Sequence, residues 1–171
     1  MDRYRAFTDQ PASSTEHPIV VIGAGLAGAT AARLLADHGF DVVVLDKGRR
    51  VGGRCSRRRL DEVVITHGSA RLDNWPTWMT AWSELEEAEQ RIHIDNDGHR
   101  LLDGPETVAA WLEGLDVLTS TTVTRLEQDG DVWSVYDDEG HVWQASGVVV
   151  TAPLPQLCLL YTSDAADDSG C

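Results

Sequence analysis

Glycines in the pattern Gly23-x-Gly25-x-x-Gly28 are the residues whose type and spacing most clearly indicate binding chemistry. In such a pattern the first glycine permits a tight turn, the second lets the backbone approach a pyrophosphate, and the third lets a helix pack close to a strand. Leu26 and Ala27 begin that helix, where free N–H groups and the helix dipole favour an anion. The pattern therefore predicts a site for the diphosphate of a dinucleotide.

A strand, a helix and a second strand must position these glycines. Residues 19–22 are apolar and mostly β-branched, which is typical of a strand buried on both faces. A helix is predicted from 26 to about 37 and a second buried strand over 42–45. Asp46 closes that strand 18 residues after Gly28, where a carboxylate can accept ribose hydroxyls. The apolar residues at helical spacing are Ala27, Ala31, Leu34 and Leu35. This unit alone does not separate NAD from FAD.

A second glycine segment follows directly. The run from Asp46 to Arg54, DKGRRVGGR, resembles the acid-x5-Gly-Gly-Arg pattern of the FAD-dependent amine oxidase superfamily. Its first three residues resemble the renalase-like branch, and His67-Gly68 resembles the branch's Asp-His-Gly segment with Thr66 in place of Asp. The resemblance covers about residues 18–157.

The resemblance implies a set of cofactor contacts. Gly52, Gly53 and Arg54 would lie along the FAD phosphates and flavin, and the backbone of Val123 would meet the adenine. The residue types fit, because glycines let the backbone crowd a cofactor and Arg54 offers a planar fork to a phosphate. The full predicted cofactor-binding set is Gly23, Gly25, Leu26, Ala27, Gly28, Asp46, Lys47, Gly52, Gly53, Arg54, Gly68 and Val123.

Basic residues are unevenly distributed. Seven of the 14 Lys and Arg residues lie between Lys47 and Arg59 in a chain of net charge −14. Arg57, Arg58 and Arg59 could supply a positive field for a diphosphate or for the phosphates of a nicotinamide substrate. The alternative is a solvated surface loop. The acidic remainder argues against nucleic-acid binding.

The rest of the chain completes the expected fold class, an α/β, Rossmann-like FAD/NAD(P)-binding domain with a parallel sheet and an antiparallel β-meander insertion, truncated. Asn74-Trp75-Pro76 begins a predicted helix with an apolar stripe at Trp78, Trp82 and Leu85. A hairpin is predicted from 91–94 and 99–102, a helix over 105–113, and a buried strand over 147–151. The predicted meander comprises 117–120, 122–127, 132–136 and 141–145.

Several classes of protein are disfavoured. Residues 1–17 are polar and predict a disordered leader without the apolar region of a signal peptide. No apolar stretch approaches a membrane span. Cys55 is the single cysteine of the body, which suits a reducing cytoplasm, and a small buried residue is its expected role. No ligand pattern predicts a metal.

Residues 158–168, CLLYTSDAADD, break the pattern and resemble the translation of a transposon mosaic-end adapter used in sequencing libraries. We therefore expect 158–171 to be an artefactual tail. The domain over 18–157 is then incomplete, with a substrate-side segment beginning at about 66–104, and the chain is an N-terminal fragment.

Three functional interpretations remain. The first is the FAD-binding portion of a flavin-dependent oxidoreductase, which accepts hydride from a reduced small-molecule substrate such as NAD(P)H. The second is an NAD(P)-binding dehydrogenase domain, and the third is a fragment with no activity of its own. The sequence assigns no catalytic residue and gives neither the substrate, the electron acceptor nor the oligomeric state.

Overall fold

The computed structural model describes residues 16–66, 71–72, 92–94, 100–102, 104–153 and 160. Predictions on Gly68, on the helix beginning at 74, and on most of the leader and tail lie outside these residues. Within the described part, no helix is long and apolar enough to cross a membrane.

Four parallel strands form the central sheet: β1 (Ile19–Ile22), β2 (Val42–Asp46), β8 (Asp116–Thr119) and β12 (Gly147–Val150). Their order is β12-β1-β2-β8. β1 is an inner strand, with Ile22 beside Leu45 on one side and Val150 on the other. Its β-branched run suits this place, because Val20 and Val21 are fully buried on opposite faces.

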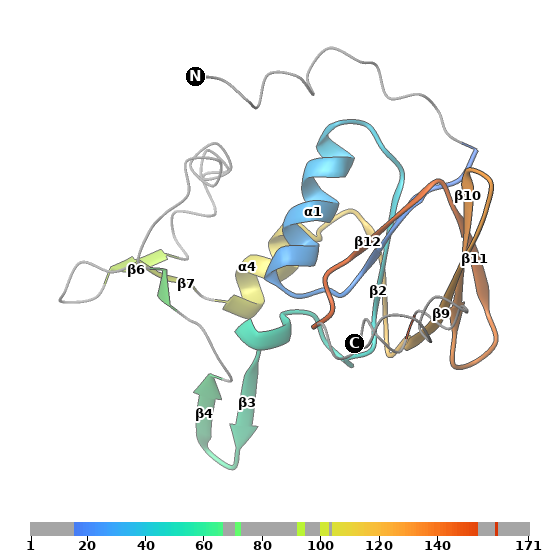
Figure 1. The fold of residues 1–171 in the computed structure, drawn as a ribbon. Coiled ribbons are helices and arrows are strands. Elements are labelled where there is room, and N and C mark those ends of the chain that lie inside the picture. The colour runs from blue at the N-terminus through green and yellow to red at the C-terminus, as the bar shows by residue number, and fades with distance from the viewer. Residues whose placement is uncertain are drawn as a thin grey trace.

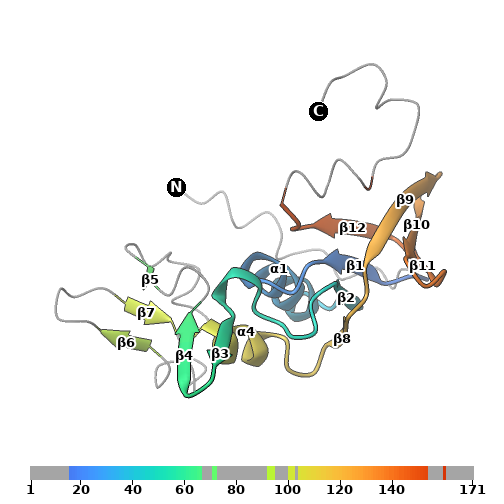
Figure 2. The same ribbon diagram turned by 90° about the horizontal axis from the view of Figure 1, so that it is seen from below.

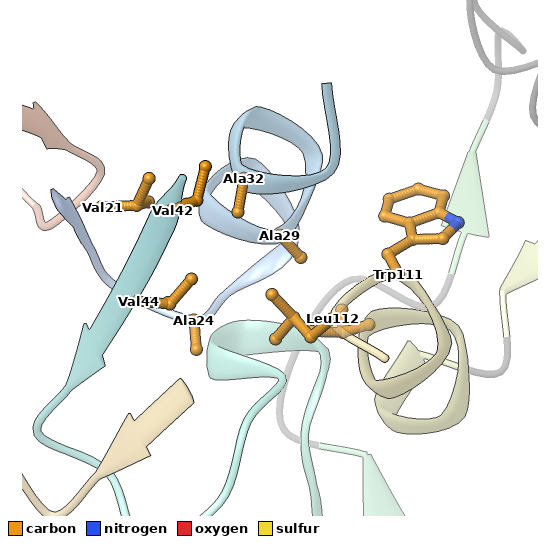
Figure 3. Packing of buried hydrophobic residues seen from close by; sticks show 9 residues of the cluster. Val21, Ala24, Ala29, Ala32, Val42, Val44, Trp111 and Leu112 are labelled. Atoms are coloured by element: carbon orange, nitrogen blue, oxygen red, sulfur yellow. The ribbon is translucent and has the colours of Figure 1, made fainter. Parts of the chain in front are cut away.

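Two helices cover one face of the sheet, α1 (Leu26–Asp37) and α4 (Gly104–Trp111) (Figure 1). Figure 3 shows Ala29 of α1 next to Leu112, which follows α4, while Val42 and Val44 of β2 face α1. Small residues on α1 let the helix pack close to the strands. The short glycine turn after β1 places the start of α1 at the end of that strand.

The buried face of α1 agrees only in part with the predicted one. Its buried residues are Gly28, Ala29 and Ala32, whereas Ala27 and Leu34 are exposed. Gly28 faces the sheet, as the third glycine of the pattern predicted, and Leu35 of the predicted stripe packs against the core. The prediction was wrong for Ala27 and Leu34. The reason is steric: only glycine fits where α1 meets the turn after β1, so Gly28 faces the sheet and fixes the orientation of the helix.

An antiparallel meander covers the other face of the sheet (Figure 1). It comprises β9 (Val123–Asp129), β10 (Val132–Asp137) and β11 (Val142–Ala145), in the order β11-β10-β9. Val135 and Ala145 of the meander pack with Val20, Ile22 and Leu45 of the sheet in a second core cluster.

β8 corrects one prediction. We expected residues 117–120 to open the meander, but β8 pairs in parallel with β2, with Val44 beside Val117. A parallel neighbour needs a crossover connection, and α4 is the helix that precedes β8. The remaining meander strands match the prediction within two residues.

Two smaller sheets stand apart from this core (Figure 2). The hairpin predicted near 91–102 is confirmed as β6 (Ile92–Ile94) and β7 (Arg100–Leu102), with β5 (Arg71–Leu72) on the other side of β7. A second hairpin, β3 (Arg57–Leu60) with β4 (Val63–Thr66), was not predicted. β3 was missed because its run of arginines lacks the alternation of apolar and polar residues that indicates a strand.

A buried carboxylate stabilises the β10–β11 turn. Asp137 accepts hydrogen bonds from the backbone N–H groups of Glu139 (3.0 Å) and His141 (2.8 Å), and from Nδ1 of His141 (2.9 Å). Burial alone would raise the pKa of Asp137, but the hydrogen bonds from His141 outweigh it and lower that pKa. The same side-chain bond to Asp137 raises the pKa of His141.

This pair predicts a stability maximum in mildly acidic solution. The contribution of Asp137 is present above its unfolded pKa, about 3.9, and is lost as pH falls through the lowered pKa. The contribution of His141 is complete below its unfolded pKa, about 6.5, and is lost as pH rises through the raised pKa. We expect Asp137→Asn to lower Tm by several degrees and to flatten its pH profile, measured by thermal unfolding.

Asp138→Asn is the matched control, because Asp138 is exposed and adjacent. It should leave both Tm and the profile unchanged. Equal profiles for Asp137→Asn and the parent chain would show that the pair does not form.

Candidate functional site

The first glycine turn lies between β1 and α1. Gly23 has a φ of +108°, a conformation that residues with a Cβ rarely adopt. Its N–H donates to the carbonyl of Leu45 (2.8 Å). The carbonyl of Ile22 accepts from the N–H of Thr151 (2.9 Å), so strands on both sides hold the turn.

Gly28 makes close contact between α1 and this turn. A Cβ built on Gly28 would lie 1.7 Å from the carbonyl oxygen of Gly23. No side chain larger than hydrogen fits there without a shift of the helix. The first and third glycines of the pattern, Gly23 and Gly28, are therefore in direct packing contact.

The N-terminus of α1 is open to an anion. Gly25 is the N-cap residue and provides no side-chain cap, and the first turn holds no acidic residue. The first backbone hydrogen bond runs from the N–H of Ala29 to the carbonyl of Gly25 (2.9 Å). The N–H groups of Leu26 and Ala27 precede it and have no acceptor within the helix, which is the arrangement that binds phosphates in other proteins.

Asp46 lies beside this turn at the end of β2 and is half-buried. Its Oδ2 accepts from the N–H of Ala24 (2.5 Å), and its Oδ1 accepts from the N–H of Gly48 (2.6 Å). An ionised carboxylate offers about four lone-pair positions, so two remain for hydroxyl donors. The carboxylate thus orients the glycine turn and can also accept from a ribose.

The two glycine segments are in direct contact. The N–H of Gly52 donates to the carbonyl of Ala24 (2.8 Å), and Gly52 forms a parallel bridge with Gly25. A Cβ on Gly53 would lie 3.1 Å from the Cα of Gly25. Gly52 and Gly53 both have positive φ values, +114° and +52°. Two motifs separated in the sequence therefore build one surface made largely of backbone.

The cationic residues near this surface are solvent-exposed. Gly53 begins a short 3-10 turn, η2 (Gly53–Cys55), which contains Arg54. Arg54 and Lys47 are exposed. The arginines that follow, Arg57, Arg58 and Arg59, belong to β3.

Cys55 is buried, as predicted. Burial raises the pKa of its thiol, and the positive charge of Arg54 offsets only part of that rise. The thiol is therefore protonated at neutral pH and is not an activated nucleophile.

The connection from β8 to β9 also reaches the site, which the sequence did not reveal. The N–H of Ser120 donates to the carbonyl of Gly48 (2.8 Å), and the N–H of Thr121 donates to the carbonyl of Asp46 (2.9 Å). Ser120 has a φ of +58°, which is uncommon for a residue with a Cβ. Val123 begins β9 three residues after Ser120 and is half-buried. The backbone predicted to meet an adenine therefore lies two residues beyond Thr121, which contacts Asp46.

No cluster of metal-ligating side chains occurs among the described residues. The site therefore consists of an open helix N-terminus, a backbone surface of three glycines and a carboxylate. These groups suit a diphosphate and a ribose, the two parts that every adenine dinucleotide shares.

Comparison with known proteins agrees with this description. Residues 21–87 match the model of the family described as NAD(P)-binding Rossmann-like domain. The chain is 31% identical over 131 residues to a pseudooxynicotine dehydrogenase from Pseudomonas sp, covering 75% of this chain and 24% of that protein. It is 50% identical over 50 residues to a zeta-carotene-forming phytoene desaturase from Myxococcus xanthus, covering 29% and 10%.

Among solved structures, that of the tetracycline destructase Tet(51) superposes with a TM-score of 0.65 at 13% identity, covering 87% of this chain and 42% of that one. The chain has a Rossmann-like fold, residues 21–87 resemble NAD(P)-binding domains, and its relatives in sequence include a dehydrogenase and a desaturase. It spans about a quarter or less of the length of these relatives.

Proposed function

We propose that this domain binds FAD as part of an oxidoreductase that accepts hydride from a reduced small-molecule substrate. The contact between Gly25 and the Gly52–Gly53 segment carries the proposal. A nucleotide site needs one glycine turn at a helix, and this chain adds a second glycine segment against the first. That second segment is the part of the sequence that resembles FAD-dependent amine oxidases.

Different residues of the site would bind different parts of the cofactor. The N–H groups at the start of α1 would bind the diphosphate, and Asp46 would accept from the adenosine ribose. Arg54 lies on the η2 turn next to Gly53, and its guanidinium would pair with a phosphate. The flavin, when bound, would supply the redox chemistry, and the protein would orient it.

Asp46 also favours one form of the cofactor. A carboxylate attracts the two hydroxyls of an unmodified ribose and repels a 2′-phosphate. FAD and NAD carry the unmodified ribose, and NADP does not. An NADP-dependent dehydrogenase domain is therefore the least favoured of the alternatives, while the renalase-like assignment of the Asp46-Lys47-Gly48 run stays a prediction.

The test is equilibrium binding of FAD, NADH and NADPH to the purified chain, followed by flavin absorption and nicotinamide fluorescence. We expect FAD to bind most tightly. NADH binding without FAD binding would support the dehydrogenase alternative instead, and binding of none of the three would contradict the proposal for this chain.

A pair of glycine substitutions tests the contact itself. Gly53 and Gly130 have similar positive φ values, +52° and +59°, so alanine strains both backbones by about 1 kcal/mol. Only at Gly53 would the new Cβ meet another segment, since nothing lies within 4 Å of one on Gly130. We expect Gly53→Ala to weaken FAD binding about tenfold or more and Gly130→Ala to leave it unchanged. Equal effects would show that the contact plays no part in binding.

A further inference from the structure

We propose that Thr151 is the positioning residue of the glycine turn, and that its hydroxyl sets the orientation in which the turn meets a diphosphate. Thr151 directly follows β12 and lies far from the motif in the sequence. The inference rests on the proposed dinucleotide function of this site and assigns a role to a residue outside the motif.

The hydroxyl of Thr151 lies against the turn. Its Oγ1 donates to the carbonyl of Ile22 (2.9 Å), and the carbonyl of Gly23 lies 3.3 Å away as a second acceptor. The parallel pairing of β12 with β1 places it there, because Val150 lies beside Ile22. The side chain is half-buried, so this bond is partly shielded from water.

Both outer glycines of the motif adjoin this hydroxyl. A Cβ on Gly23 would lie 2.6 Å from Oγ1 of Thr151, and a Cβ on Gly28 would lie 3.0 Å from it. The hydroxyl therefore occupies the space that the two glycines leave free. The motif needs glycine at these positions partly because Thr151 is there.

The bond completes the set of contacts that hold the turn. From the carbonyl of Ile22 to the carbonyl of Ala24, each backbone N–H and C=O group has a partner in β2, in the Gly52 segment or at Thr151, where the carbonyls of Ile22 and Gly23 share the single hydroxyl hydrogen. Hydrogen bonds at every polar group of the turn restrain the rotation of its peptide planes. The next N–H groups, at the start of α1, then keep one direction before any anion arrives.

Two substitutions separate the hydroxyl from the rest of the side chain. Thr151→Val keeps the shape and removes the hydroxyl, whereas Thr151→Ser keeps the hydroxyl. Thr30→Val is the matched control, because the hydroxyl of Thr30 bonds within α1 to the carbonyl of Leu26 (2.7 Å) and does not touch the turn. Thr151→Ala serves in place of Thr151→Val if that variant fails to fold.

Two measurements decide the proposal. Thr151→Val should weaken binding of FAD and of ADP about tenfold without weakening that of adenosine, which has no phosphate. In the chain without cofactor, it should also speed amide hydrogen exchange over residues 23–28 about tenfold. Thr151→Ser and Thr30→Val should behave like the parent chain in both measurements.

The outcomes are distinct. Unchanged binding and exchange in Thr151→Val, or a lower Tm alone, would overturn the proposal and leave Thr151 a structural residue. If the parent chain binds neither FAD nor NADH, the proposed function fails, and hydrogen exchange alone then decides whether Thr151 positions the turn.

Discussion

Gly28→Ala should reduce the free energy of unfolding by about 3 kcal/mol or more and abolish dinucleotide binding. The new methyl group would lie 1.7 Å from the carbonyl oxygen of Gly23, which is well inside van der Waals contact. Backbone cannot yield as a flexible side chain does, so α1 would have to move away from β1. That movement would carry the N–H groups of the first helical turn away from the site. Urea unfolding and FAD titration measure the two effects.

Gly147→Ala is the control for this substitution. Gly147 also lies in the central sheet, but the nearest atom to a Cβ there is Cγ1 of Ile19 at 3.9 Å, an ordinary contact. We expect the two variants to differ in unfolding free energy by about 2 kcal/mol or more. A Gly28→Ala chain as stable as Gly147→Ala would contradict the close packing of α1 on the turn.

Asp46→Asn should have the second largest effect. Both carboxylate oxygens accept from backbone N–H groups, those of Ala24 and Gly48. An amide keeps only one oxygen, so one N–H would face another donor. Hydrogen bonds to charged groups contribute about 1.5–3 kcal/mol each, and we expect a loss of unfolding free energy in that range. Since the same carboxylate would accept from the ribose, FAD affinity should fall about 10- to 100-fold.

Asp116→Asn removes one negative charge from the neighbouring strand β8, where the residue is exposed. It should change neither stability nor affinity, which separates the hydrogen bonds of Asp46 from its charge. Loss of stability without loss of affinity in Asp46→Asn would mean that Asp46 only holds the turn and does not bind the ribose.

The unit over residues 19–46 was predictable because its signals are local. β1 and α1 have the predicted bounds, and β2 includes the predicted terminal Asp46. A β-branched run, a glycine turn and helical periodicity follow one another, and each limits the next. Both glycine segments were identified in the sequence, but the contact between them was not predicted. No local sequence pattern indicates which turns pack against each other in the fold.

Other parts depend on distant partners. The strand at residues 116–119 is short and was assigned to the meander because it precedes the meander strands in sequence, although its partner is β2. The close packing of Gly28 was predicted, but Leu34 of the predicted apolar stripe is exposed, because steric exclusion at Gly28 sets the orientation of the helix. Thr151 gave no sequence signal, since a threonine at the end of a strand is common.

The place of β12 beside β1 has a consequence for the order of events in a newly made chain. Thr151 comes 129 residues after Ile22, so a ribosome releases the glycine motif long before the strand that completes its turn. Until β12 arrives, β1 has one unpaired edge and the turn lacks the hydrogen bonds that Thr151 donates to it. A nascent chain that stops before β12 would contain the whole glycine motif but would lack the strand and the threonine that complete its turn. Capture of the nucleotide therefore belongs to the last stage of folding of this domain.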